Sequence, residues 1–145
     1  MLRDRTIDRS GLGKIVFRDA RKKSVLESIL HPKVIEEERR LFDAIRARDS
    51  KAIAVIDAAL LIESGNFRNM DKVAVVVCDE ETQIQRLLKR GVWSREEIVG
   101  RLAAQMPLKD KLKFAHYIIA NDSTVEDLKD RVSALFAELR SIAGQ

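Results

Sequence analysis

Several residue classes are scarce in this sequence, and each scarcity removes a class of protein. Cys78 is the only cysteine, so no disulfide can form within the chain, and a reducing cytoplasm is the expected location. No apolar run approaches the ~20 residues that a membrane-spanning helix needs. Residues 1–9 lack the apolar core of a secretory signal peptide. We therefore expect a cytoplasmic protein with no membrane partner. Its 145 residues are enough for one domain with its own hydrophobic core.

Aromatic residues are also few, at 5% of the 145 residues, and no basic run is interleaved with them, so no nucleic-acid partner is expected. The net charge of +4 is mild and suits an anionic small molecule. His31 and His116 have no cysteine or acidic partners at the spacing of a metal site, so we expect no protein-bound metal. No serine, histidine and aspartate stand in the order of a nucleophile elbow.

The most informative stretch is residues 53–63, with the sequence IAVIDAALLIE. Ile53 to Asp57 form an apolar run that is too short for a helix and has no polar alternation, which predicts a strand buried on both faces. Such strands belong to parallel sheets, which bind ligands at the carboxyl ends of their strands, so Asp57 is a candidate site residue. The simpler interpretation is that Asp57 only caps the following turn.

Further strands are predicted at Val73–Cys78 and Tyr117–Ala120, and their alternation with helices indicates the α/β class with a parallel sheet. Asp79 and the Ser94–Glu97 capping box predict helix starts, and a Ser123–Glu126 box predicts the start of the last helix. Periodicity predicts helices over 20–30, 32–48, 80–90, 94–104 and 108–114, with a break at His31-Pro32.

Glycine and basic residues suggest phosphate chemistry at two places. Residues 10–14, SGLGK, fail the phosphate-loop pattern, because Asp8 and Ile15 stand where glycine and Ser or Thr are needed, so Gly11 and Gly13 predict a turn into a short helix. Residues 86–113 are rich in basic side chains, and Arg86 and Arg90 share one helical face that can bind a polyphosphate. The alternative is that these arginines are ordinary solvent-exposed charges.

Several segments stand in order along the chain: IDRSGLGKIVF, LESILHP, IDAALLIE, QRLLKRG, SREE, RLAAQMPLKDKL and IIAND. Together they resemble the dephospho-CoA kinase family over essentially the whole chain. The resemblance implies a P-loop kinase that transfers the γ-phosphoryl group of ATP, bound with Mg²⁺, to the ribose 3′-hydroxyl of dephospho-CoA, the last step of coenzyme A synthesis. It also implies an incomplete three-layer α/β fold, with a helical substrate-binding region at 1–50 and a nucleotide-kinase core at 51–145 that includes a lid at about 86–115.

The same resemblance implies roles for individual residues. Arg90 and Arg101 match the catalytic phosphate clamp of the lid. Arg86, Asn121 and Asp122 match the nucleotide-binding positions. The substrate-binding positions are Asp57, Leu60, Leu61, Glu63, Arg9 and His31.

Two departures from the family stand out. The first strand, the glycine-rich loop ending in GKS and the acidic residue thought to activate the hydroxyl have no counterpart here, so the chain is expected to be a truncated form with doubtful activity by itself. The family's PLLFE is replaced by AALLIE at the substrate wall. We expect marginal stability, with self-association or swapping through the incomplete sheet. The alternatives are a non-catalytic CoA- or nucleotide-binding fragment or subunit and, more weakly, a purely structural or interaction domain.

Overall fold

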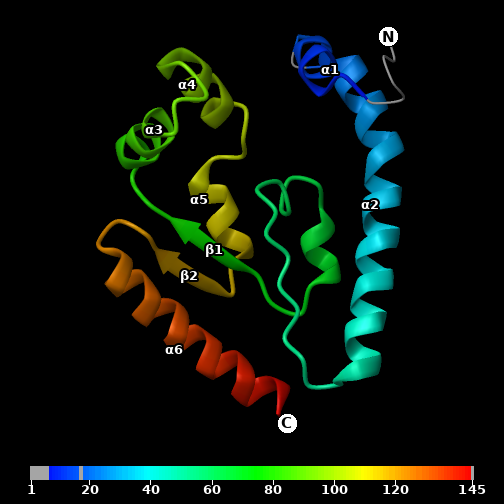
Figure 1. The fold of residues 1–145 in the computed structure, drawn as a ribbon, viewed down its shortest axis with the longest axis vertical. Coiled ribbons are helices and arrows are strands. Elements are labelled where there is room, and N and C mark those ends of the chain that lie inside the picture. Colours follow the sequence, from blue (N-terminus) through cyan, green and yellow to red (C-terminus); the bar gives the residue numbers. More distant parts are fainter. Residues whose placement is uncertain (1–6, 17, 145) are drawn as a thin grey trace. The chain divides into compact units, whose positions relative to one another are not determined.

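The computed structural model describes residues 7–16 and 18–144, which divide into two compact units with the boundary between Ala54 and Val55. The first unit holds helices α1 (Arg9–Val16) and α2 (Ala20–Arg48) (Figure 1). Each begins at an aspartate that accepts backbone hydrogen bonds: Asp8 from Gly11, and Asp19 from Arg21 and Lys22. Gly11 and Gly13 lie inside α1, so the predicted turn at these glycines is wrong.

Helix α2 runs through Pro32, so the predicted break at His31-Pro32 is also wrong. A proline inside a helix removes one backbone hydrogen bond and crowds the preceding turn. The helix is solvent-exposed over much of its length around this position, so water can bind the carbonyl that the proline leaves free. The preference of the residue before proline for extended backbone is a tendency, and the surrounding helical residues outweigh it here.

The second unit is an α/β arrangement around a small parallel sheet. Strands β1 (Ala74–Val77) and β2 (Tyr117–Ala120) pair in parallel, with Ala74 opposite Tyr117 and Val77 opposite Ala120. Along the chain between the two strands lie α3 (Glu80–Lys89), α4 (Arg95–Ala103), α5 (Leu108–Lys111) and the 3-10 turn η2 (Leu112–Phe114). The 3-10 turn η1 (Asn66–Asn69) precedes β1. Helix α6 (Val125–Ala143) follows β2 and packs against it (Figure 1). The α/β class and the strands predicted at Val73–Cys78 and Tyr117–Ala120 are confirmed.

Residues 53–57 are not in a strand, which corrects the prediction for this run. The segment has no ladder partner in the described part of the chain, where the sheet consists of β1 and β2. Val55 is 81% exposed as a result. An apolar run has the composition of a buried strand, but the strand forms only when a neighbouring strand pairs with its backbone groups.

Most of the predicted helix starts in the second unit are confirmed. Asp79 accepts a hydrogen bond from Thr82 N at the start of α3, and Ser94 and Glu97 form a reciprocal capping box at α4. The box at α6 is formed by Thr124 and Asp127, one residue later than predicted. Ser123–Glu126 has the same spacing and chemistry, so the sequence pattern alone does not distinguish the two registers.

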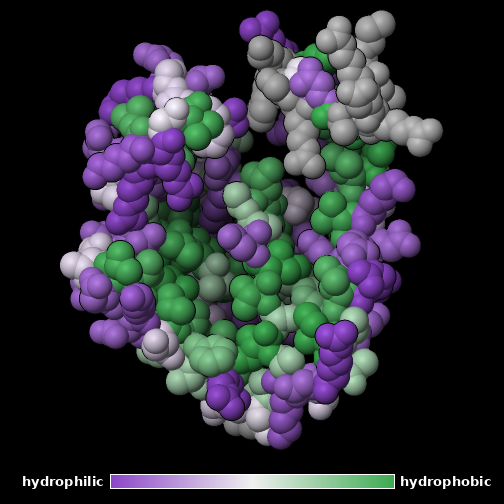
Figure 2. All heavy atoms as spheres, viewed as in Figure 1, coloured by the Kyte–Doolittle hydropathy of each residue, from purple (hydrophilic) through white to green (hydrophobic). Residues whose placement is uncertain are grey.

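The apolar core of the second unit is small. Ile62, Val73 and Val75 form a buried cluster, with Phe67 and Met106 among the residues packed against it. Ile84 in α3 and Ile98 in α4 are buried where these two helices pack together. Figure 2 shows hydrophobic side chains gathered around the strands, whereas hydrophilic ones predominate over α3 and α4. Among the described residues, no helix is both long enough and apolar enough to cross a membrane.

Candidate functional site

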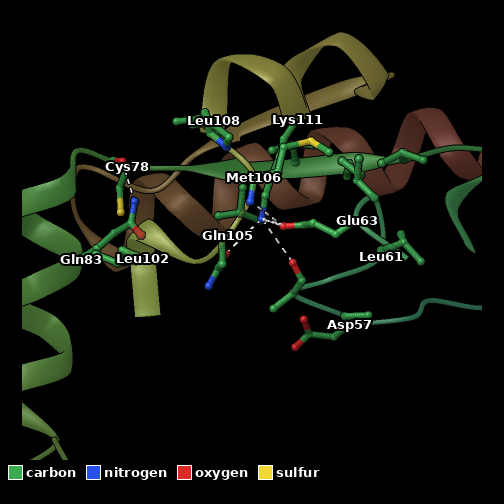
Figure 3. Close-up of a pocket in the computed structure, with 18 of the residues that line it drawn as sticks. Asp57, Leu61, Glu63, Cys78, Gln83, Leu102, Gln105, Met106, Leu108 and Lys111 are labelled. Carbon is green, nitrogen blue, oxygen red and sulfur yellow. Dashed lines mark hydrogen bonds and ion pairs between the residues drawn. The ribbon is translucent and has the colours of Figure 1, made fainter. Parts of the chain in front are cut away.

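A pocket of about 600 Å³ lies in the second unit (Figure 3). One wall is the segment 56–63, which contributes Asp57, Leu61 and Glu63. The other sides come from β1, from α3 and α4, and from residues 105–111, which follow α4. Asp57 lines this pocket, and the segment that carries it has no regular secondary structure where a strand was predicted.

Lys111 and Glu63 form the most buried ion pair that the structure describes. Lys111 Nζ lies 2.9 Å from Glu63 Oε1, and the two side chains are 15% and 20% exposed. The same ammonium group donates to Gln105 Oε1 at 3.1 Å and to the carbonyl of Ala59 at 3.3 Å. Glu63 Oε1 also accepts a hydrogen bond from Met106 N at 3.2 Å. We call these contacts the Lys111 network (Figure 3).

The Lys111 network stabilises the ionised form of Glu63. Burial acts to raise the pKa of this carboxyl group. The pKa is nevertheless below its ordinary value of 4.5, because the carboxylate accepts hydrogen bonds from Lys111, from its own backbone and from Met106, and because the positive charge of Lys111 is near. A carboxyl group whose pKa is lower in the folded state contributes stability above its unfolded pKa. That contribution is lost as the pH falls through the folded-state pKa.

We therefore predict a pH-dependent difference between the wild-type protein and a Glu63→Gln variant, in which this position cannot titrate. Urea unfolding should show the wild type as the more stable protein above about pH 5, where an unfolded glutamate is ionised. The difference in the free energy of unfolding should shrink as the pH falls below 4.5. Comparing the two proteins removes the contribution of every other carboxylate. A difference that stays constant through the acidic range would contradict this assignment.

The three residues predicted to bind the nucleotide lie near one another at the end of β2. Arg86 in α3 donates from Nη1 to the carbonyl of Asn121 at 2.7 Å, which joins this helix to the loop after β2. Asp122 is next in the chain, and its Oδ1 lies 3.6 Å from Arg131 Nη1. Arg131 also donates to the carbonyl of Ala120 at 3.0 Å. The predicted group of Arg86, Asn121 and Asp122 is thus one local cluster, to which α6 adds Arg131.

The two predicted clamp arginines lie on the α3–α4 pair. The guanidinium carbon of Arg101 lies 4.4 Å from the centre of the Trp93 ring, so the aromatic face holds the cation in place. Arg90 is exposed at the end of α3. Arg95 forms an ion pair with Glu81, with 2.7 Å between Nη2 and Oε2. The basic stretch 86–113 therefore contains paired structural charges as well as the candidate ligand-binding ones.

Three further residues were predicted to bind the substrate: Arg9, His31 and Leu60. His31 is an exposed residue of α2 in the first unit, and Arg9 is the first residue of α1 with a side chain outside the description. Leu60 is half exposed and is not among the residues that line the pocket. The described residues include no group of three or more His, Cys, Asp or Glu side chains placed to hold a metal ion.

Several residues of the site carry no signal in the sequence. Lys111 is one of many basic residues in 86–113, and Gln105 and Trp93 belong to no motif that indicates a role. Lys111 and Glu63 are far apart in the chain and match no short motif, so no local pattern signals their contact. A hint was available for Trp93, since an aromatic residue in a short link between two basic helices suits cation binding.

Comparison with known proteins yields consistent matches. A family model described as dephospho-CoA kinase matches residues 1–127. The dephospho-CoA kinase of Lactobacillus johnsonii is 40% identical over 136 residues, which cover 94% of this chain and 68% of the relative. That of Geobacter sulfurreducens is 41% identical over 138 residues, which cover 95% of this chain and 70% of the relative.

Two solved structures also resemble the chain. A protein from Thermus thermophilus aligns with a TM-score of 0.72 and 30% identity, covering 94% of this chain and 70% of that one. The dephospho-CoA kinase from Campylobacter jejuni aligns with a TM-score of 0.62 and 29% identity, covering 97% of this chain and 69% of that one.

Proposed function

The chain belongs to the dephospho-CoA kinase family, and we propose that it serves the phosphorylation of the ribose 3′-hydroxyl of dephospho-CoA by ATP. One observation carries the proposal. The pocket of the second unit has Asp57, Leu61 and Glu63 on one wall, and α3 and α4 line another part of it through Glu80, Gln83, Val99, Leu102 and Ala103. Arg90 and Arg101 lie on the same helix pair but are not among the residues that line the pocket, so the proposal places the polyphosphate at these arginines and the acceptor substrate at the 57–63 wall.

In this proposal the arginines of the α3–α4 pair bind the phosphates of ATP. Phosphoryl transfer depends on positioning and on stabilising negative charge, and guanidinium groups bind phosphate oxygens in a bidentate manner. Arg90 and Arg101 would act on the transferred group, while Arg86, Asn121 and Asp122 would lie beside the nucleoside. Mg²⁺ would enter with ATP as part of the substrate complex, held chiefly by phosphate oxygens and water.

The acceptor, dephospho-CoA, would be bound by the 57–63 segment and by the helical region at 1–50. Asp57, Leu60, Leu61 and Glu63 form the proposed substrate wall, and Arg9 and His31 are the proposed contributors from the helices. Asp57 would lie beside the substrate or its metal ion and would not take the proton from the hydroxyl.

The direct test is to incubate the purified chain with dephospho-CoA and ATP in the presence of Mg²⁺. Mass spectrometry would detect CoA, which is heavier than dephospho-CoA by one phosphoryl group. Product that is lost in Asp57→Ala and Arg90→Ala variants supports the proposal. An absence of product, in a chain that still binds dephospho-CoA, contradicts catalysis by this chain and supports the second candidate function.

That second candidate is the binding of CoA or nucleotide without turnover. The observation that favours it concerns residues 10–14, the segment whose sequence is most similar to a phosphate-binding loop. These residues lie inside α1 and do not form such a loop, which argues against turnover by this chain. At this helix start Gly11 N donates to Asp8 Oδ1 and Leu12 N donates to the Asp8 carbonyl, so these two N–H groups are already bonded and the segment does not form the open turn of a glycine-rich phosphate loop.

Self-association through the sheet is a further part of the proposal. β1 has a neighbouring strand on one side only in the part of the chain that is described, and Val76 is 57% exposed. Such an edge is a template for pairing with another polypeptide. Sedimentation velocity should therefore show concentration-dependent dimers, and a single monomeric species at all concentrations would contradict this part. We also propose the cytoplasm as the location, because the single cysteine cannot form an internal disulfide.

A further inference from the structure

Lys111 is placed to join two segments from distant parts of the chain, residues 59–63 and residues 105–111. Its ammonium group has three N–H donors, and the structure provides three acceptors: Glu63 Oε1 at 2.9 Å, Gln105 Oε1 at 3.1 Å and the carbonyl of Ala59 at 3.3 Å. The side chain is 15% exposed, so water competes weakly for these contacts. No donor of Lys111 is left to bind a ligand while this arrangement holds.

Glu63 depends on Lys111 for its charge balance. Its Oε1 atom accepts from Lys111 and from Met106 N, whereas Oε2 is buried and has no hydrogen-bond partner among the described residues. A carboxylate in this state is stabilised chiefly by the nearby ammonium group. Removing that group would leave a poorly solvated negative charge, which is strongly unfavourable.

The Lys111 network differs from the other lysine pair nearby. Lys113 pairs with Asp110 three residues away, and its side chain is 71% exposed, so this bridge stays within one short segment. Two bonds of the Lys111 network instead join residues that are 43 and 52 positions apart, while its bond to Gln105 spans six. Exposed pairs such as Lys113 with Asp110 contribute little to the free energy of unfolding. A buried bridge between two separate segments restricts the movement of one segment relative to the other.

We propose that Lys111 and Glu63 are positioning residues for the reaction, an inference that rests on the proposed function. Ala59 and Glu63 lie in the 57–63 segment that carries the proposed substrate wall, and Gln105 and Met106 follow the C-cap residue of α4, the helix that carries Arg101. The network holds the wall at a fixed place relative to the base of α4. The network thereby fixes the position of the acceptor hydroxyl, bound at the wall, relative to the phosphate bound by Arg101. Glu63 is part of this wall, and its contacts with Lys111 and Met106 fix where the wall lies.

The test compares Lys111→Met with the matched control Lys113→Met in the full chain. Calorimetric titration at low temperature, where both variants are folded, would measure the dissociation constants of dephospho-CoA and ATP separately. Hydrogen exchange would follow the Met106 amide. For Lys111→Met we expect dephospho-CoA to bind roughly tenfold more weakly and the Met106 amide to exchange faster, since small misplacements of a site have large effects. Lys113→Met should leave the dissociation constant of dephospho-CoA and the exchange rate of the Met106 amide within about twofold of the wild-type values, as expected for an exposed pair.

A Glu63→Gln variant keeps the inference testable if Lys111→Met does not fold. Glutamine retains an oxygen that can accept from Met106 N but loses the charge that pairs with Lys111, so dephospho-CoA affinity should fall while the Met106 amide stays protected. Unchanged affinities in folded Lys111→Met or Glu63→Gln, with only a lower melting temperature, would show a purely structural pair and overturn the inference. A wild-type chain that binds neither ligand would instead overturn the proposed function, and the positioning role with it.

Discussion

Replacing Ile98 by alanine is expected to lower the free energy of unfolding of the second unit by about 3 kcal/mol, because large-to-small changes at buried isoleucine typically cost 2–5 kcal/mol. Ile98 is 0% exposed, the most completely buried side chain that the structure describes. The core around it is small, so few neighbours can move to fill the cavity. Typical domains have only about 5–15 kcal/mol of stability in total, so the change is a large fraction of it.

The position of the single tryptophan makes this effect measurable. Trp93 lies in the link between α3 and α4, so its fluorescence during urea unfolding reports on the helix pair that Ile98 stabilises. The control is Val99→Ala, at the next residue of the same helix, where the side chain is 43% exposed and the cost should be well under half as large. Equal losses in the two variants would contradict the assignment of Ile98 to the core.

The second large effect is expected from Arg101→Ala, which should weaken ATP binding by about thirtyfold. A hydrogen bond to a charged group contributes roughly 1.5–3 kcal/mol, and each 1.36 kcal/mol is a factor of ten in affinity. The Trp93 ring beneath the guanidinium holds it in one place, so less conformational entropy is lost when phosphate binds. Calorimetric titration with ATP in the presence of Mg²⁺ would measure the change.

Two further variants isolate the role of Arg101. Arg101→Lys keeps the charge but loses the bidentate geometry and the planar contact with Trp93, so an intermediate affinity is expected. Arg95→Ala removes a charge from the same helix, but this arginine is already paired with Glu81, so ATP binding should change little. If Arg95→Ala weakens binding as much as Arg101→Ala, the effect comes from net charge and the clamp assignment is wrong.

The parts of the fold that were predictable depend on local chemistry. β1 and β2 are short runs rich in valine and isoleucine, and α3 and α4 begin at side chains that satisfy their first N–H groups. Each of these signals lies within a few residues of the structure that it predicts. The helix that continues through Pro32 shows the limit of such signals, because a statistical preference at one residue was outweighed by the residues around it.

The parts that were not predictable depend on contacts between distant segments. Residues 53–57 have the composition of a central strand, but whether they pair depends on a neighbour that their own sequence does not specify. The site shows the same division. Asp57 was predicted from the apolar run that it ends and Arg101 from the resemblance to the family, and both roles stay predictions, whereas the contact of Lys111 with Glu63 and Ala59 appears only in three dimensions.

The most direct test of the central claim is to titrate dephospho-CoA into the full chain and compare it with an Asp57→Ala variant. The account predicts saturable binding of one dephospho-CoA per chain, and weaker binding when the wall residue Asp57 is replaced. Absence of saturable binding, or binding of equal strength in the variant, would contradict the claim that this pocket receives the acceptor substrate of a dephospho-CoA kinase.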